Sequence, residues 1–252
     1  MSNRAPYIQS NPSPILNHMH LFYTPDIALT NELPEEEAAH AMRVLRLQTG
    51  DEVCLTDGKG AFYQARIAEC NRKRCLVEVM EREEQPPLWQ GHLHLAMGPT
   101  KNMDRTEWLA EKATEIGLDE LSFLNCQWSE RRVIKRERIE KILVSAMKQS
   151  LKARLPQLNE MTDFLSFIKR PFKGQKFIAH CHEGEKVPLR TALRGDEDAL
   201  VLIGPEGDFS PEEVAEAVKQ GYVPVTLGHT RLRTETAALV AVHLMNLTHT
   251  SE

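Results

Sequence analysis

The chain has 252 residues, of which 41% are hydrophobic, and a formal net charge of −5. This length suits two domains, and no apolar run approaches the ~18 residues that a membrane-spanning helix needs, so we expect no membrane partner. The chain does not start with the charged-then-apolar pattern of a secretion signal, which favours a cytoplasmic location. An acidic total does not by itself indicate a nucleic-acid partner.

The cysteines are five in number, scattered, and without CxxC spacing. This pattern argues against both a disulfide framework and a structural zinc site, and it fits a reducing compartment. His180, Cys181 and His182 form a small cluster, but neighbouring side chains of a strand point to opposite faces. We therefore expect the end of a strand at this cluster, and no bound metal.

Residues 1–18 are polar, contain three prolines and show no periodicity, which is typical of a disordered extension or a non-native remnant. From there to residue 84 the pattern is of β type. It predicts strands at 53–56, 61–67 and 75–80, a short helix over 35–47 and a hairpin loop at 57–60. Several short strands so close together predict a small barrel. The charged, proline-containing stretch 81–87 then predicts a boundary between domains at 19–84 and 88–252.

After the boundary the chain alternates between strand and helix patterns. Such alternation predicts a parallel sheet with helices on both faces. One helix start is marked by Ser210 as N-cap, Pro211 at the first helical position and Glu213 completing a capping box. In the helix at 103–116 we expect a buried stripe that includes Trp108. The predicted strands are 92–97, 121–124, 176–180, 199–203 and 223–227, and the helices 103–116, 136–152, 211–220 and 234–248.

Three of these strands run directly into a glycine, namely Gly98, Gly204 and Gly228. A glycine lets the backbone approach a ligand closely, although three ordinary tight turns would show the same pattern. Ligands of parallel sheets bind beyond the carboxyl ends of the strands. The chain lacks both the phosphate-binding GxxxxGKS/T loop and a dinucleotide fingerprint, which disfavours a kinase or a dehydrogenase. A neutral, adenosine-like cofactor held by main-chain atoms fits better.

The charged segment 231–236 lies between a glycine loop and a helix that is apolar nearly all round. Such a helix is buried on several sides, and charges at its start must be paired or functional. Two interpretations stay open. Either Arg233 and Glu235 form a structural ion pair while Thr234 caps the helix, or these residues take part directly in catalysis.

Basic residues concentrate between positions 131 and 154, where the segment carries a net charge of +7 within an acidic protein. A run of charge is usually a solvated helix face, but a basic run can also bind phosphate.

Several motifs together resemble a known family. Gly204-Pro205-Glu206-Gly207, followed by Leu227-Gly228 and then by residues 232–237 (LRTETA), resembles the signature of the SPOUT methyltransferases. Further matches are residues 40–46, Lys101 with residues 111–117, and Gln149-Ser150 before Pro156. Because these matches occur in order over nearly the whole chain from Met19, the chain is similar to the ribosomal RNA small subunit methyltransferase E (RsmE) family. One departure is Asp208, where the family usually has a glycine.

The resemblance implies a PUA-like β-barrel that binds RNA, followed by a SPOUT-type α/β domain with a deep trefoil knot. It implies S-adenosyl-L-methionine as cofactor in the knotted loops and a homodimer in which two subunits complete each active site. The implied reaction is methylation of N3 of a uridine in the 16S rRNA of the small ribosomal subunit.

The resemblance also implies roles for individual residues. Arg233 would stabilise the developing uracil anion, with Glu235 orienting it or acting as base. The expected cofactor contacts are Leu202, Ile203, Gly204, Glu206, Gly207, Leu227, Gly228, Arg231, Leu232 and Thr236. The expected RNA contacts are Arg43, Arg46, Lys101, Arg131, Arg132, Lys152 and Arg154.

Two other functions remain as alternatives. One is ribose 2′-O methylation of RNA by an enzyme of the same superfamily. The other is RNA binding without catalysis, which predicts a basic patch and no cofactor. The sequence leaves open which nucleotide is modified, whether the substrate is free RNA or an assembled subunit, and which residue accepts the proton.

Overall fold

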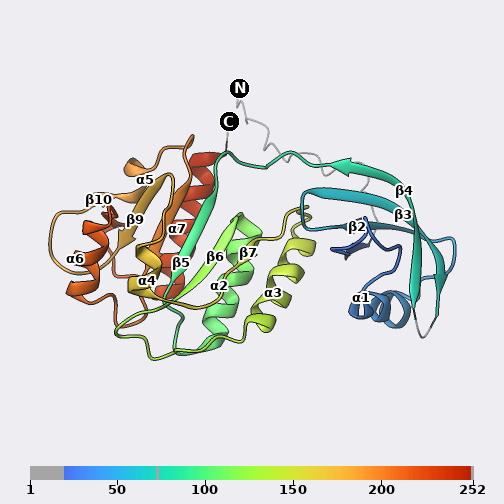
Figure 1. Cartoon of the computed structure of the whole chain (residues 1–252), viewed down its shortest axis with the longest axis horizontal. Coiled ribbons are helices and arrows are strands. Elements are labelled where there is room, and N and C mark those ends of the chain that lie inside the picture. The colour runs from blue at the N-terminus through green and yellow to red at the C-terminus, as the bar shows by residue number, and fades with distance from the viewer. Residues whose placement is uncertain (1–19, 72–73, 251–252) are drawn as a thin grey trace, which may run out of the picture. The chain divides into compact units, whose positions relative to one another are not determined.

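The structure is a computed structural model that describes residues 20–71 and 74–250 (Figure 1). The expected extension at 1–18 lies outside the described residues. The chain forms two compact units. The first contains the chain up to Pro86 together with Met147–Leu155, and the second contains Pro87–Ala146 and the chain from Pro156 onward.

The first unit is built on one four-stranded sheet with the order β1-β2-β3-β4. β1 pairs parallel to β2, and the other pairs are antiparallel. The helix predicted over 35–47 is an α-helical turn followed by a π-helix, and it ends at Arg46 in the left-handed conformation, with φ of 55°. The elements are β1 (Leu21–Tyr23), α1 (Glu35–His40), η2 (Ala41–Leu45), β2 (Glu52–Thr56), β3 (Ala61–Cys70) and β4 (Cys75–Glu84).

Residues 147–155 belong to the first unit although they follow it far along the chain. The Gly60 amide donates to the carbonyl of Ala153 at 2.9 Å, and the Leu155 amide donates to the carbonyl of Gly58 at 2.9 Å. The segment is therefore held by the loop between β2 and β3. The predicted boundary between 84 and 88 assigns these residues to the second domain instead. The sequence could not show their place in the first unit, because backbone pairing with a distant loop leaves no periodic pattern.

Cys70 and Cys75 form a disulfide, which corrects the expectation of unpaired cysteines for these two residues. They face each other in the register of β3 and β4, at the end of the strand pair next to the connecting turn. The cause is hairpin geometry, which brings two cysteines together without any CxxC spacing. The remaining cysteines, Cys54, Cys126 and Cys181, are free.

The second unit contains an eight-stranded sheet in which every strand pair is parallel. The strand order is β10-β12-β9-β11-β5-β6-β7, and β8 pairs with β6. The strands are β5 (Leu93–Met97), β6 (Glu120–Asn125), β7 (Gln157–Leu158), β8 (Thr162–Asp163), β9 (Gln175–Ala179), β10 (Val187–Pro188), β11 (Ala199–Ile203) and β12 (Val223–Thr226). The helices are α2 (Met103–Ile116), α3 (Arg136–Gln149), α4 (Phe164–Ile168), α5 (Leu189–Ala192), α6 (Pro211–Lys219) and α7 (Thr234–His249).

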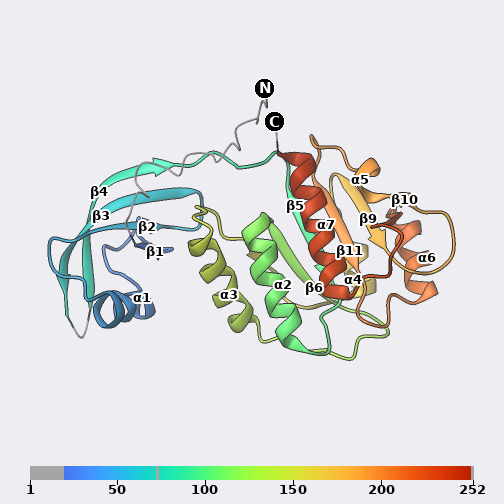
Figure 2. The ribbon, with the colours of Figure 1, turned by 180° about the vertical axis from the view of Figure 1, so that it is seen from behind.

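Helices cover both faces of this sheet, as the alternating pattern predicts. α2 and α7 lie on the face toward the viewer in Figure 2, and α7 packs on β5 and β11. α4 and α6 cover the opposite face through Phe164, Phe167 and Ala217. No helix of the described chain is both long enough and apolar enough to cross a membrane.

The start of α6 shows the predicted capping box. The Glu213 amide donates to the Ser210 hydroxyl at 3.2 Å, and the Ser210 amide donates to the Glu213 carboxylate at 2.8 Å. The second Glu213 oxygen accepts from the Gln127 amide at 2.8 Å. This carboxylate therefore fixes both the start of α6 and the loop after β6.

The buried side of α2 differs from the predicted stripe. Leu109, Ala110 and Ala113 are fully buried, whereas Trp108 is 43% exposed. The difference arises because α7 packs along α2, and small residues permit this close packing. At the far end of the pair, a side chain at Gly117 would collide with Asn246 of α7.

A polar cluster lies near the amino end of β5. His92 Nε2 lies 2.7 Å from Glu120 Oε2, and His94 Nε2 lies 2.8 Å from the Ser122 hydroxyl. Burial lowers the pKa of His94 to about 4. A hydrogen bond to the Glu120 carboxylate raises the pKa of the half-exposed His92.

We predict that His94 makes the free energy of unfolding fall as the pH drops from ~6.5 to about 4. In this window the unfolded chain binds a proton at position 94 and the folded chain does not. The slope from one such group is at most ~1.4 kcal/mol per pH unit. His94→Gln should flatten the dependence measured by urea unfolding. His92→Gln should leave the slope in this window nearly unchanged, because the raised pKa of His92 places its own effect on stability above pH ~6.5. An unchanged slope in His94→Gln contradicts the assignment.

Candidate active site

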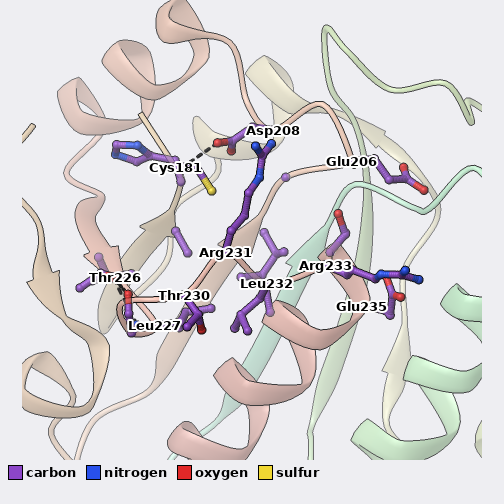
Figure 3. A pocket seen from close by; sticks show the side chains of 18 of the residues that line it. Cys181, Glu206, Asp208, Thr226, Leu227, Thr230, Arg231, Leu232, Arg233 and Glu235 are labelled. Carbon is purple, nitrogen blue, oxygen red and sulfur yellow. Dashed lines mark hydrogen bonds between the residues drawn. The ribbon is translucent and has the colours of Figure 1, made fainter. Parts of the chain in front are cut away.

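A cavity of about 710 Å³ opens at the carboxyl ends of β9, β11 and β12 (Figure 3). Small-molecule sites usually measure ~300–1,000 Å³. Its wall continues along the loop from Gly228 to Arg233 into the first turn of α7, and Arg105 of α2 completes it. The parallel strands cause this placement, since their carboxyl ends meet at one edge of the sheet.

The loop after β11 is a tight turn held by close backbone packing. A side chain at Gly204 would collide with the backbone of Asp208 and Phe209, and one at Gly98 would collide with Pro205. Asp208 itself has a φ of 67°, in the left-handed region where glycine is favoured. Its carboxylate accepts from the amides of Cys181 at 2.7 Å and Phe209 at 2.8 Å. These two bonds stabilise an aspartate at the position where the resembled family usually has glycine.

The loop after β12 is fixed by its own side chains. Thr226 Oγ1 donates to the carbonyl of Gly228 at 2.8 Å, and Gly228 has a φ of 145°. Beyond it, Figure 3 shows the Arg231 side chain extending toward Asp208. This loop therefore supplies main-chain groups and two arginines, Arg231 and Arg233, to the cavity wall.

Two charged residues expected in catalysis, Arg233 and Glu235, lie at the start of α7. Glu235 is only 8% exposed, and its Oε1 lies 3.7 Å from Nε of Arg105. The structural alternative of an Arg233–Glu235 ion pair is thus wrong, because the partner of Glu235 comes from α2. The expected cap by Thr234 is also absent: Arg233 occupies the N-cap position, and no side chain caps the helix.

The end of β9 adds cavity residues that no sequence motif assigns to the site. His180, Cys181 and Lys186 line the cavity. Burial and the nearby Lys186 lower the pKa of His180, and its buried Nδ1 has no hydrogen-bond partner in the described chain. Burial and the neighbouring Asp208 raise the pKa of the Cys181 thiol. The predicted strand at 176–180 was the available signal, because its carboxyl end had to reach the same edge of the sheet.

Most of the expected cofactor residues line the cavity. These are Ile203, Gly204, Glu206, Leu227, Gly228, Arg231 and Leu232, together with both expected catalytic residues, Arg233 and Glu235. Three others lie outside the lining. Leu202 packs in the core beneath the sheet, Gly207 lies against Trp128, and Thr236 is exposed on α7.

In the second unit, the expected RNA contacts gather beside the loop after β11. Lys101 forms an ion pair with Glu130 at 2.7 Å, and its amide donates to Glu206 Oε1 at 2.8 Å. The Arg131 guanidinium donates to the carbonyl of Lys101 at 2.8 Å. Arg132 is exposed and donates to Asn125 and to the carbonyl of Gln127. Lys101 and Arg131 are thus connected to Glu206, which lines the cavity.

In the first unit, Arg43 and Arg46 are exposed on and just after η2, and Lys152 is partly buried. Arg154 donates to the carbonyls of Lys59 and Gln85. The basic stretch 131–154 is consequently divided between the two units. Several of its other cations have acidic partners: Arg136 pairs with Glu140 and Glu160, Arg138 with Glu107, and Lys148 with Glu37.

Within the described ranges, no group of three or more His, Cys, Asp or Glu residues is placed to hold a metal ion. The cavity wall presents guanidinium, carboxylate and imidazole groups and main-chain atoms.

Known proteins with similar sequences and folds agree with this arrangement. The RNA methyltransferase domain model matches residues 87–246, and the RNA methyltransferase PUA domain model matches residues 33–80. The ribosomal RNA small subunit methyltransferase E of Mycobacterium bovis is 30% identical over 239 residues, which are 88% of this chain and 89% of that protein.

Two solved structures extend the similarity to the fold. A probable rRNA-methyltransferase from Porphyromonas gingivalis has a TM-score of 0.87 and 44% identity, covering 92% of this chain and 98% of that one. The ribosomal RNA small subunit methyltransferase E of Neisseria gonorrhoeae, solved bound to S-adenosyl methionine, has a TM-score of 0.78 and 26% identity, covering 91% and 98%. They confirm the predicted fold class, a SPOUT-type α/β methyltransferase domain preceded by a PUA-like domain. The chain therefore belongs to the ribosomal RNA small subunit methyltransferase E family of RNA methyltransferases.

Proposed function

We propose that this protein methylates N3 of a uridine in the 16S rRNA of the small ribosomal subunit, with S-adenosyl-L-methionine as methyl donor. The observation that carries the proposal is the cavity at the carboxyl ends of β9, β11 and β12, which has Arg233 and a buried Glu235 in its wall. An enzyme acting on ribosomal RNA works where ribosomes are assembled, so we place it in the cytoplasm.

The residues around the cavity fit this cofactor. Ile203, Val225 and Leu227 provide an apolar wall for the adenosine, and Gly204 and Gly228 leave main-chain groups accessible. The buried Nδ1 of His180 has no hydrogen-bond partner in the described chain. Buried polar atoms are nearly always paired, so an unpaired one in the cavity wall favours a polar ligand there. When bound, S-adenosylmethionine supplies an electrophilic methyl group.

The protein's own contribution is to remove a proton and stabilise an anion. Uracil N3–H is weakly acidic, and its anion carries charge on O2 and O4. We assign Glu235 as the acceptor: the N3–H bond breaks, its electron pair stays on N3, and the proton moves to the carboxylate. Arg233 stabilises the anion. The uncapped amino end of α7 adds free amide groups and a partial positive charge at the same place.

RNA binding is assigned to cations of both units. Lys101, Arg131 and Arg132 lie beside the cavity lining, and Arg43, Arg46, Lys152 and Arg154 belong to the first unit. Phosphate contacts of this kind make binding salt-dependent. The target base would be reached in single-stranded RNA or after extrusion from a helix.

We predict that the protein binds S-adenosylmethionine with micromolar affinity in calorimetry. We also predict that it restores 3-methyluridine to 16S rRNA from cells that lack it. Nucleoside mass spectrometry after digestion distinguishes this product from a 2′-O-methylated uridine. If the protein does not bind the cofactor, the proposal of an enzyme is wrong, and RNA binding without catalysis is the remaining alternative. If the product is a 2′-O-methylated uridine, the protein methylates the ribose and not the base.

Arg233→Ala is expected to lower kcat by roughly 10²-fold, as is typical when one group that stabilises a transition-state anion is lost. Cofactor affinity should stay within about twofold, because adenosine is assigned to main-chain groups and apolar side chains. Arg194→Ala is the matched control, since Arg194 pairs with Glu197 outside the cavity lining. Near-full turnover of Arg233→Ala with normal cofactor binding refutes the assigned role.

We also propose that two copies form a homodimer through α2 and α7. These adjacent helices expose Trp108 and Leu247, the latter by 63%. α7 is apolar nearly all round, and an exposed apolar helix face favours a partner that covers it.

The dimer should be detected by sedimentation velocity at micromolar concentration, and Leu247→Asp should shift it toward monomer. Val133→Asp is the control, because Val133 is 73% exposed but lies outside both helices. A wild-type protein that sediments as a monomer at these concentrations contradicts the proposal.

A further inference from the structure

Glu235 has an unusual environment for a carboxylate. Its side chain is nine-tenths buried in the cavity wall, and only one of its two oxygens has a partner. Oε1 lies 3.7 Å from Nε of Arg105, whereas Oε2 is buried without a hydrogen-bond donor in the described chain. A buried carboxylate oxygen left in this state costs free energy, and proteins tolerate the cost mainly where a ligand supplies the missing donor.

Arg105 reaches this position from the first turns of α2. Its side chain is 40% exposed, and its guanidinium makes no hydrogen bond to another residue of the described chain. A guanidinium has five N–H donors. The single contact with Glu235 therefore leaves donors available on the surface of the cavity that Arg105 lines. Arg105 is thus placed both to hold Glu235 and to donate to a ligand.

The same wall holds two guanidinium groups that can donate, from Arg105 and Arg233, and one carboxylate that can accept, from Glu235. The imide edge of uracil has the complementary set, with N3–H as donor between the acceptors O2 and O4. We propose that these three residues recognise that edge, with Oε2 of Glu235 accepting from N3–H and the two guanidinium groups donating to the carbonyl oxygens. This inference rests on the proposed uridine methylation and adds Arg105 as a specificity-determining residue that also positions the proton acceptor.

The arrangement selects uracil over cytosine. Cytosine has no N3–H, so Oε2 of Glu235 would face a lone pair and remain unpaired. Its exocyclic amine would face a guanidinium, which can only donate. A site built around such hydrogen bonds rejects an analogue that lacks them, because its buried polar groups are then left without partners.

The test is a double-mutant cycle on the full-length protein, with Arg105→Met, Glu235→Gln and the double variant. The substrate is 16S rRNA from cells that lack the protein. Arg105→Met should lower kcat at least roughly tenfold. The double variant should be no slower than Glu235→Gln alone, because residues that act as a unit are not additive. Arg105→Lys should recover part of the loss, and calorimetry should give unchanged S-adenosylmethionine binding in every variant.

Arg138 and Glu107 provide the matched control. Glu107 lies on the same helix α2, and its ion pair with Arg138 measures 2.6 Å, but neither residue lines the cavity. The cycle of Arg138→Met with Glu107→Gln should leave kcat near the wild-type value. A merely structural Arg–Glu bridge would lower the thermal midpoint in both cycles, without a specific loss of kcat in the first.

The outcomes separate the two levels of the proposal. If the wild-type protein neither binds the cofactor nor methylates the RNA, the proposed function fails, and the inference fails with it. If the wild type is active but Arg105→Met turns over normally, the assignment of Arg105 is overturned while the function stands. The assignment is also overturned if the fold-losses of kcat in the two single variants multiply in the double variant. Such a result would mean that Arg105 and Glu235 act independently.

Discussion

The parallel pairing of β9, β11 and β12 is the constraint on which the site depends. Parallel strands end at the same edge of a sheet, so three chain segments far apart in sequence must turn back at one place. Each turn has its own local solution. The turn after β11 uses Gly204 and the left-handed Asp208, whereas the turn after β12 uses Thr226 and Gly228. The cavity is the space that these turns leave between them.

The packing of α2 against α7 has a comparable effect on the chemistry. The two helices run side by side in the same direction, with Arg105 and Glu235 at one end and Gly117 and Asn246 at the other. This packing places a guanidinium from α2 against a carboxylate that α7 buries. Without it, Glu235 would be a buried charge with no partner, which folded proteins rarely tolerate.

Features with a local cause could be predicted from the sequence. The capping box of Ser210 and Glu213 involves residues three apart, and the alternation of strands and helices depends on periodicity that each segment shows by itself. The glycine loops could be placed at the site because the predicted strands led directly into them. The resemblance to a known family added the cofactor and the reaction, which no periodicity contains.

Features that arise from tertiary contacts could not be predicted. Arg105 shows no sign in sequence that its partner lies on the last helix, whereas proximity along the chain favours Arg233 as the partner of Glu235. The basic stretch 131–154 looked continuous, yet the fold divides it between two units and pairs several of its charges. Cys70 and Cys75 become partners only once the register of the hairpin is known.

The bonds of Asp208 also bear on how the cavity can open. Asp208 accepts from the Cys181 amide, and His182 Nε2 lies 2.6 Å from the carbonyl of Phe209, so the end of β9 and the turn after β11 are joined twice. Neither wall can swing outward alone without breaking both links. Widening of the cavity is therefore a concerted movement of two segments, and a ligand that enters encounters a pocket that is largely formed beforehand rather than one shaped by an independent flap.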